Sequence, residues 1–284
     1  MGYGYYTTAA SCNYKTRTFG TADTVTLSNM SAQSVYKARR LDPALDPLNK
    51  RRVCADSKDH PNSLPIILGL DCTGSMGHAA TATLAKMDET MEELYKTNKD
   101  VEFCVMGIGD FYCDDAPLQV SQFESDIRIL EQSAALWLEF GGGGNAYESY
   151  TGPWYFGTYR CDCDCWKRGK KGILITCGDE GMNPFINPDK LRDVIGGELE
   201  GPTDTAELYK EASKKWDIYH IAITDQSCYS RYKDKIEETW RPLLGDHLII
   251  AASDELPQVI SSIVNNANLD MESSFSVSDE GISW

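Results

Sequence analysis

The chain has 284 residues, 42% of them hydrophobic, and a formal net charge of −16. This length can bury one large core, so one α/β domain with extensions fits better than two equal halves. The acidic balance excludes nucleic acid and anionic membrane as expected partners, because like charges repel.

No apolar run approaches the roughly 18 residues of a membrane span. The start, Met1–Tyr6, has neither the basic residues nor the apolar core of a signal peptide. We therefore expect a cytoplasmic protein with no membrane partner, either free or incorporated into a virion or another particle.

Residues 1–62 mix Tyr, Thr, Ser, Asn and basic residues without a sustained period, and residues 34–40 are their only helix-like piece. Such a stretch is typical of an irregular N-terminal arm that packs on its domain or on another subunit. The arm is therefore the expected route to a homo- or hetero-oligomer.

The next stretch is an apolar run from Leu64 that stops at Asp71, after which Thr73 and Ser75 follow at a spacing of two. The run predicts a strand buried on both faces of a parallel sheet. A carboxylate and two hydroxyls on one turn are hard oxygen donors, which suit Mg²⁺, Mn²⁺ or Ca²⁺. The alternative is a cluster that only caps the following helix.

Beyond this turn, apolar residues at intervals of three and four predict a helix over residues 77–97. A strand over 101–110 ends in Asp110, an edge strand covers 118–123, and a second helix covers 124–139.

Four consecutive glycines then occupy residues 141–144, followed by Asn145 and Glu148. Glycine permits positive φ and close backbone approach, so a special loop geometry is expected. A flexible linker before a helix cap is the alternative, and a phosphate-binding P-loop would need a following Gly-Lys-Ser/Thr. Residues 147–159 read as a helix whose aromatic side chains belong to the core.

The ten cysteines include several in predicted buried strands, where Cys acts as a small hydrophobe. In a cytosolic chain we expect free thiols. Cys161, Cys163 and Cys165 alternate, so three thiolates could face a soft metal, although zinc sites usually use Cys-x₂-Cys pairs and four ligands. A variable loop is the other interpretation.

A second buried strand over 170–180 ends in Asp179 and Glu180, and strands over 218–223 and 247–252 alternate with helices. This alternation predicts an α/β fold with a doubly wound, mostly parallel six-stranded sheet flanked by helices. The domain is expected over residues 63–267, and residues 268–284 form an acidic C-terminal tail.

The Asp71-x-Thr73-x-Ser75 motif after a buried strand, followed by Met76-Gly77, resembles the metal-ion-dependent adhesion site (MIDAS) of von Willebrand factor A (vWA) domains. The Gly-rich loop resembles the variants found beside α-kinases and in bacterial and phage proteins. The resemblance covers roughly residues 63–267 and implies a Rossmann-like sheet with a cation at its carboxyl edge.

The resemblance also implies a set of metal ligands. Asp71, Thr73 and Ser75 would bind directly, Asn145 or Glu148 would add a ligand, and Asp179 would bind the metal or hold a water. Strict alignment puts Cys177 where the family has its last acid, but a thiol is a poor ligand for Mg²⁺.

The function implied is recognition of a protein partner, whose Asp or Glu replaces a water on Mg²⁺ (or Mn²⁺ or Ca²⁺), and no enzyme activity is expected. We place six residues at the partner-contacting surface: Gly74, Met76, Asp110, Gly143, Gly144 and Glu180.

Two other functions compete with this one. The chain could be a structural subunit of a phage or bacterial assembly in which the metal only stabilises the domain. It could also be a metal-dependent hydrolase with Asp179, Glu180 or Asp110 as base. The sequence around Ser75, Gly-Ser-Met-Gly, departs from the Gly-x-Ser-x-Gly of a nucleophile elbow.

Overall fold

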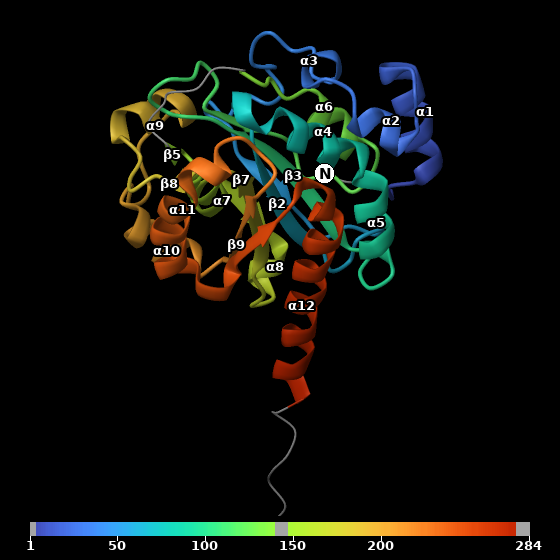
Figure 1. Ribbon diagram of the computed structural model, residues 1–284. Helices are drawn as coiled ribbons and strands as arrows, with labels where there is room; N and C mark the ends of the chain where they lie inside the picture. Colours follow the sequence, from blue (N-terminus) through green and yellow to red (C-terminus); the bar gives the residue numbers. More distant parts are fainter. Residues whose placement is uncertain (1–3, 140–146, 277–284) are drawn as a thin grey trace, which may run out of the picture.

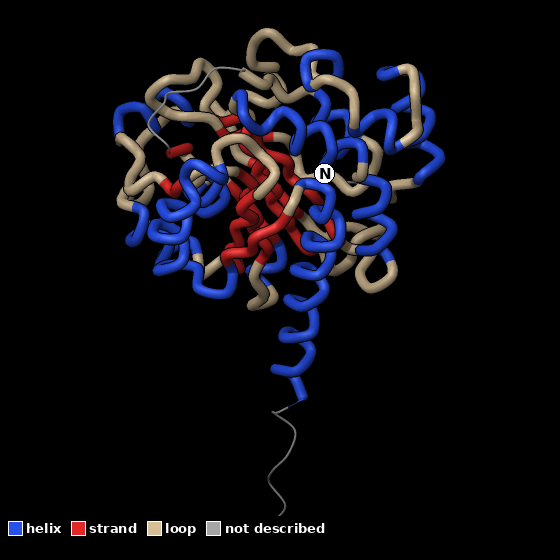
Figure 2. The backbone as a smooth tube through the Cα atoms, in the orientation of Figure 1, coloured by secondary structure: helices blue, strands red, loops and turns tan. Residues whose placement is uncertain are grey.

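A six-stranded sheet lies at the centre of the molecule with helices on both faces (Figure 1; Figure 2). The computed structural model describes residues 4–139 and 147–276, with side chains up to residue 267. The strand order is β10-β9-β7-β2-β3-β4, and only β4 runs antiparallel to its neighbour. The predicted fold class is therefore confirmed. The strands are β2 (Leu64–Asp71), β3 (Val101–Ile108), β4 (Leu118–Val120), β7 (Gly172–Gly178), β9 (Trp216–Ile223) and β10 (Leu248–Ala251).

Two sets of helices cover the two faces of the sheet. The first face carries α4 (Gly77–Ala85), α5 (Met87–Tyr95), α6 (Arg128–Ala134) and α12 (Leu256–Ser276). The second face carries α7 (Thr151–Tyr159), α9 (Pro188–Ile195), α10 (Thr205–Ala212) and α11 (Tyr229–Leu244). A sheet covered on both faces needs strands that are apolar throughout, which is why β2 and β7 lack polar alternation.

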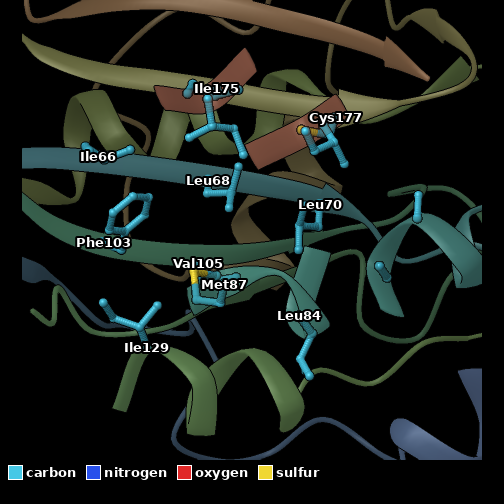
Figure 3. Close-up of a cluster of buried hydrophobic side chains, with 14 of the residues drawn as sticks. Ile66, Leu68, Leu70, Leu84, Met87, Phe103, Val105, Ile129, Ile175 and Cys177 are labelled. Carbon is cyan, nitrogen blue, oxygen red and sulfur yellow. The ribbon is translucent and has the colours of Figure 1, made fainter. Parts of the chain in front are cut away.

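The central strand β2 shows how one apolar run serves both faces. Ile66, Leu68 and Leu70 belong to the first core cluster, whereas Ile67 belongs to the second. This alternation follows from the two-residue period of a strand. In the first cluster, side chains of β2 meet those of the neighbouring strands and of α4 and α5 (Figure 3).

The helix predicted over 77–97 is divided into α4 and α5 at Lys86. At this break Lys15, from the N-terminal arm, donates from Nζ to the carbonyl of Ala85 (2.7 Å) and to Oδ2 of Asp88 (2.6 Å). A side chain from a distant part of the sequence therefore binds the last carbonyl of α4. The spacing of apolar residues within 77–97 gives no sign of this contact.

The N-terminal arm has more regular structure than expected. Residues 4–62 contain α1 (Thr8–Phe19), α2 (Thr24–Ser28), α3 (Ala32–Val35) and β1 (Arg52–Cys54), whereas the sequence predicted one helix-like piece over 34–40. The prediction failed because α1 has no apolar stripe: its buried residues are Ser11 and Lys15. Its ends carry the usual signals, an N-cap at Thr7 and a left-handed Gly20.

The arm also covers an edge of the sheet. The carbonyl of Leu45 accepts from the backbone N–H of Val120 in β4 (2.7 Å). Farther along, β1 pairs in parallel with β6 (Cys161–Cys163). An edge strand whose backbone is hydrogen-bonded is protected from pairing with another chain.

Cys161, Cys163 and Cys165 are buried, two of them in β6 before α8 (Asp164–Lys167). All ten cysteines are free thiols. Within residues 4–139 and 147–276, no group of three or more His, Cys, Asp or Glu side chains is arranged to hold a metal. This segment is therefore a short strand followed by a helix, with its three thiols buried, and not the variable loop that the sequence suggested.

Three further segments differ from expectation. The helix predicted over 124–139 is shorter, and residues 147–159 begin as β5 (Tyr147–Glu148), which pairs with β8 (Gly181–Met182). Helix α12 continues to Ser276, past residue 268, where the tail was expected to begin.

In the described part of the chain, none of the helices has the length and apolarity needed to cross a membrane.

Replacing Lys15 with Met is expected to destabilise the protein by about 3 kcal/mol, because it removes one partner of a buried ion pair and leaves Asp88 uncompensated. Urea denaturation monitored by circular dichroism measures the loss. The exposed Lys210→Met serves as the control, and an equally small effect of both substitutions would contradict the importance of this contact.

Candidate metal centre

The candidate site lies at the carboxyl edge of the sheet, where β2 and β7 end as hydrogen-bonded neighbours. β2 ends at Asp71, and Thr73 and Ser75 follow, with Ser75 in a short 3₁₀ helix (Gly74–Met76). β7 ends at Gly178, one residue before Asp179. Ligands in open α/β sheets bind at this edge.

Asp71 is fully buried, and three hydrogen bonds hold its carboxylate. Oδ1 accepts from the backbone N–H of Thr73 (2.9 Å) and from the Thr73 hydroxyl (2.6 Å). Oδ2 accepts from the hydroxyl of Tyr150 (2.7 Å). The carboxylate is therefore fixed from two sides.

Asp179 is held in the same manner from the next strand. It is fully buried, its Oδ1 accepts from the Ser75 hydroxyl (2.9 Å), and its Oδ2 accepts from the backbone N–H of Cys228 (2.9 Å), just before α11. Thr73 and Ser75 thus both donate their hydroxyl protons to buried carboxylates. The lone pairs of a hydroxyl that donates its proton remain available to another partner.

Glu148 is the most strongly perturbed carboxyl group in this region. It lies in β5 opposite Met182 and is 3% exposed. Its Oε2 finds no hydrogen-bond donor among the described residues. Burial, followed by repulsion from Asp71 and Glu180, raises its pKa far above the ordinary value.

The other carboxyl groups of the site also have raised pKa values. Burial and then the nearby Asp179 raise the pKa of Asp71, and burial raises the pKa of Asp179 and of Glu180. A divalent cation would relieve the repulsion, and carboxylate and hydroxyl oxygens are the donors that Mg²⁺ and Ca²⁺ accept. The residues present therefore fit a hard cation, with Thr73 and Ser75 supplying the oxygens that a cluster of three acids would otherwise supply.

The remaining predicted residues are divided between this site and other places. Asp110 was expected at the partner-contacting surface, but it is only 2% exposed, because its carboxylate turns back to accept from the backbone N–H of Tyr112. It contributes to the raised pKa of Glu148. Cys177 lies in the hydrophobic core (Figure 3), so the acid that follows β7 is Asp179. Three predicted residues, Gly143, Gly144 and Asn145, lie outside the described residues.

The predicted location of Met76 was wrong. We expected it at the partner-contacting surface, but it is 2% exposed and packs in the first core cluster. Met76 directly precedes α4, and its side chain packs into the core together with the buried residues of that helix. Gly74, two residues earlier in the same turn, is exposed.

Sequence reasoning missed Tyr150 and Cys228. Tyr150 was assigned to the core, and nothing in its local pattern signals that its hydroxyl reaches Asp71, which is 79 residues away in the sequence. Cys228 contributes a backbone N–H, which carries no residue-specific signal. Gly178 leaves the space that the Tyr150 hydroxyl occupies, because a Cβ at this position would lie 2.0 Å from the hydroxyl oxygen.

A scan against protein-family models and a search of curated proteins gave no match. Among solved structures, the chain is similar to the pilus adhesin SpaC from Lactobacillus rhamnosus GG in its open conformation, with 12% identity over 78% of this chain and 31% of that one (TM-score 0.48). It is similar to an aerotolerance-related membrane protein from Bacteroides fragilis, with 11% identity over 72% and 100% of the two chains (TM-score 0.44).

A third similar structure is a von Willebrand factor type A protein from Catenulispora acidiphila, with 14% identity over 80% of this chain and 51% of that one (TM-score 0.39). The chain spans about a third of the length of SpaC. All three TM-scores lie below 0.5, and the function proposed below is argued from the residues of this chain.

The raised pKa values predict how stability depends on pH when metal is absent. The folded chain binds these protons more tightly than the unfolded chain, so stability is present below about pH 4 to 5 and falls as pH rises through the raised values, by up to about 1.4 kcal/mol per pH unit for each group. Urea denaturation of the EDTA-treated protein between pH 5.5 and 8.5 measures this slope.

Glu148→Gln removes the most strongly perturbed carboxyl group of the site and should make the slope shallower. Excess Mg²⁺ should flatten the slope of the wild type. Stability that rises with pH in the EDTA-treated protein would contradict this account of the site.

Proposed function

We propose that this chain is a protein-binding module, of the adhesion or assembly kind, that recognises a carboxylate of its partner through a divalent cation. The observation that carries the proposal is the polarity of two hydrogen bonds. Thr73 and Ser75 donate to Asp71 and Asp179, so both hydroxyl oxygens keep lone pairs for a cation.

The proposed roles follow from these contacts. Thr73 and Ser75 bind the cation, while Asp71 and Asp179 orient the hydroxyls and compensate the positive charge from the interior. Asp71 then acts mainly through Thr73, because its oxygens already accept three hydrogen bonds. The sequence predicted Asp71 as a direct ligand, and the present proposal gives it an indirect role instead.

Mg²⁺ prefers six oxygens, so two hydroxyls leave positions for water and for one further protein group. Glu148, with its unpartnered Oε2, is the candidate among the described residues. When bound, the cation would supply the positive charge that attracts an Asp or Glu of a partner. The motif keeps its resemblance to the MIDAS of vWA domains.

A structural subunit lashed by its arm is less well supported. The arm is engaged with its own domain, through Lys15 on Ala85 and Asp88 and through Leu45 on Val120. A hydrolase would need a carboxylate that can reach a substrate water, whereas Asp71 and Asp179 are fully buried and their oxygens already accept hydrogen bonds from within the chain.

The first experiment is calorimetric titration of the EDTA-treated protein with Mg²⁺, Mn²⁺ and Ca²⁺. Saturable binding is expected in the wild type, with affinity reduced at least about tenfold in Ser75→Ala and in Thr73→Ala, because each loses a ligand oxygen. Thr83→Ala is the control, since its hydroxyl donates to the Ala79 carbonyl within α4. Wild-type protein that binds none of the three ions would refute the proposal.

A partner should then be captured in the presence of Mg²⁺ and lost on addition of EDTA. At a Mg²⁺ concentration that fills only the wild-type site, the Ser75→Ala protein should capture much less of the partner than the wild type does. Capture that is indifferent to both the chelator and the substitution would show that recognition occurs elsewhere on the molecule.

A further inference from the structure

Tyr150 lies between β5 and α7, and its side chain reaches Asp71 in the candidate site. Its side chain is fully buried, and its hydroxyl donates to Oδ2 of Asp71 (2.7 Å). Burial, reinforced by the negative charge of Asp71, raises its pKa well above the ordinary value, so the phenol keeps its proton and remains a donor.

Aromatic packing fixes the ring of Tyr150. The ring meets His220 edge to face (centroids 5.0 Å apart) and lies tilted against Trp240 (5.4 Å). The rings of His220 and Trp240 are stacked on each other, with their centroids 3.7 Å apart. Trp240 donates from Nε1 to the carbonyl of Glu180 (3.2 Å), so this aromatic cluster contacts the chain on both sides of the site.

The strand on the other side leaves room for the phenol. Gly178, the last residue of β7, faces the ring, and any Cβ at this position would lie 2.0 Å from the hydroxyl oxygen and 2.4 Å from two ring carbons. The tyrosine, the glycine and the aromatic cluster therefore specify one position for the hydroxyl.

The hydroxyl has a distinct part in the hydrogen bonding of Asp71. Among the described residues, the other two donors both belong to Thr73 and both reach Oδ1. Tyr150 supplies the donor for Oδ2, and it comes from outside the motif. Without it, Oδ2 would be buried and unsatisfied, and the carboxylate could rotate away from Thr73.

We propose that Tyr150 is a positioning residue for the cation site: its hydroxyl fixes the Asp71 carboxylate, which in turn holds the Thr73 hydroxyl with its lone pairs toward the cation. This inference rests on the proposed function. Partners that orient metal-binding groups typically account for a 10- to 100-fold difference in metal affinity.

The test compares Tyr150→Phe with Tyr155→Phe by calorimetric titration with Mg²⁺. Both substitutions remove one hydroxyl from a fully buried tyrosine. The Tyr155 hydroxyl accepts from the N–H groups of Glu200 (2.8 Å) and Gly201 (3.2 Å), in a different network. We expect Mg²⁺ affinity to fall about 10- to 100-fold in Tyr150→Phe and to stay unchanged in Tyr155→Phe.

A double-mutant cycle separates positioning from a structural role. Asp71→Asn keeps an oxygen for Thr73, so it should weaken Mg²⁺ binding without abolishing it. If Tyr150 acts through Asp71, adding Tyr150→Phe to Asp71→Asn should cause little further loss. Additive losses would overturn the inference, since they would show that Tyr150 acts independently of the carboxylate.

Gly178→Ala gives an independent route, because the added Cβ displaces the phenol while Tyr150 keeps its hydroxyl, and it too should weaken binding. Wild-type protein that binds no cation would refute the proposed function together with this inference. Wild-type binding with unchanged affinity in Tyr150→Phe would overturn this inference alone and leave the proposed function intact.

Discussion

The structure depends on keeping the carboxylate of Asp71 in the interior, at the end of a strand covered on both faces. Burying a carboxylate costs several kcal/mol unless hydrogen bonds or a cation compensate the charge. Here the compensation comes from Thr73 and Tyr150. Because Asp179 lies buried at the end of the adjacent strand, the two carboxylates also repel each other, and the local fold stays under electrostatic strain.

The sheet could be predicted from the sequence because its strands are continuous apolar runs bounded by polar residues or glycine. Strands such as β2 and β7 bury every residue, so no alternative period competes with the prediction. Helix α1 was missed for the opposite reason. It packs by means of Ser11 and Lys15, and a buried lysine carries no hydrophobic signal. The break at Lys86 was also missed, because the contact responsible joins residues 70 positions apart.

The candidate site shows the same division between local and distant information. The spacing of the motif accounts for the contact of Thr73 with Asp71, whereas Ser75 donates to Asp179, which is 104 positions away in the sequence. Tyr150 and the N–H of Cys228 join them only after the chain has folded, and neither belongs to a pattern. The position of Met76 was predicted wrongly because a residue in a turn can face either the solvent or the core, and the packing of α4 places this side chain in the core.

The backbone bond between Leu45 and Val120 has a consequence for how the chain can be divided. A boundary at residue 63 looks natural, since the central sheet begins there. A fragment that starts at this residue would lack the backbone hydrogen bond between Leu45 and the edge strand β4. It would also lack Lys15, the partner of the Asp88 carboxylate. Exposed sheet edges promote aggregation. We therefore expect a fragment that retains the arm to aggregate less than one that begins at residue 63.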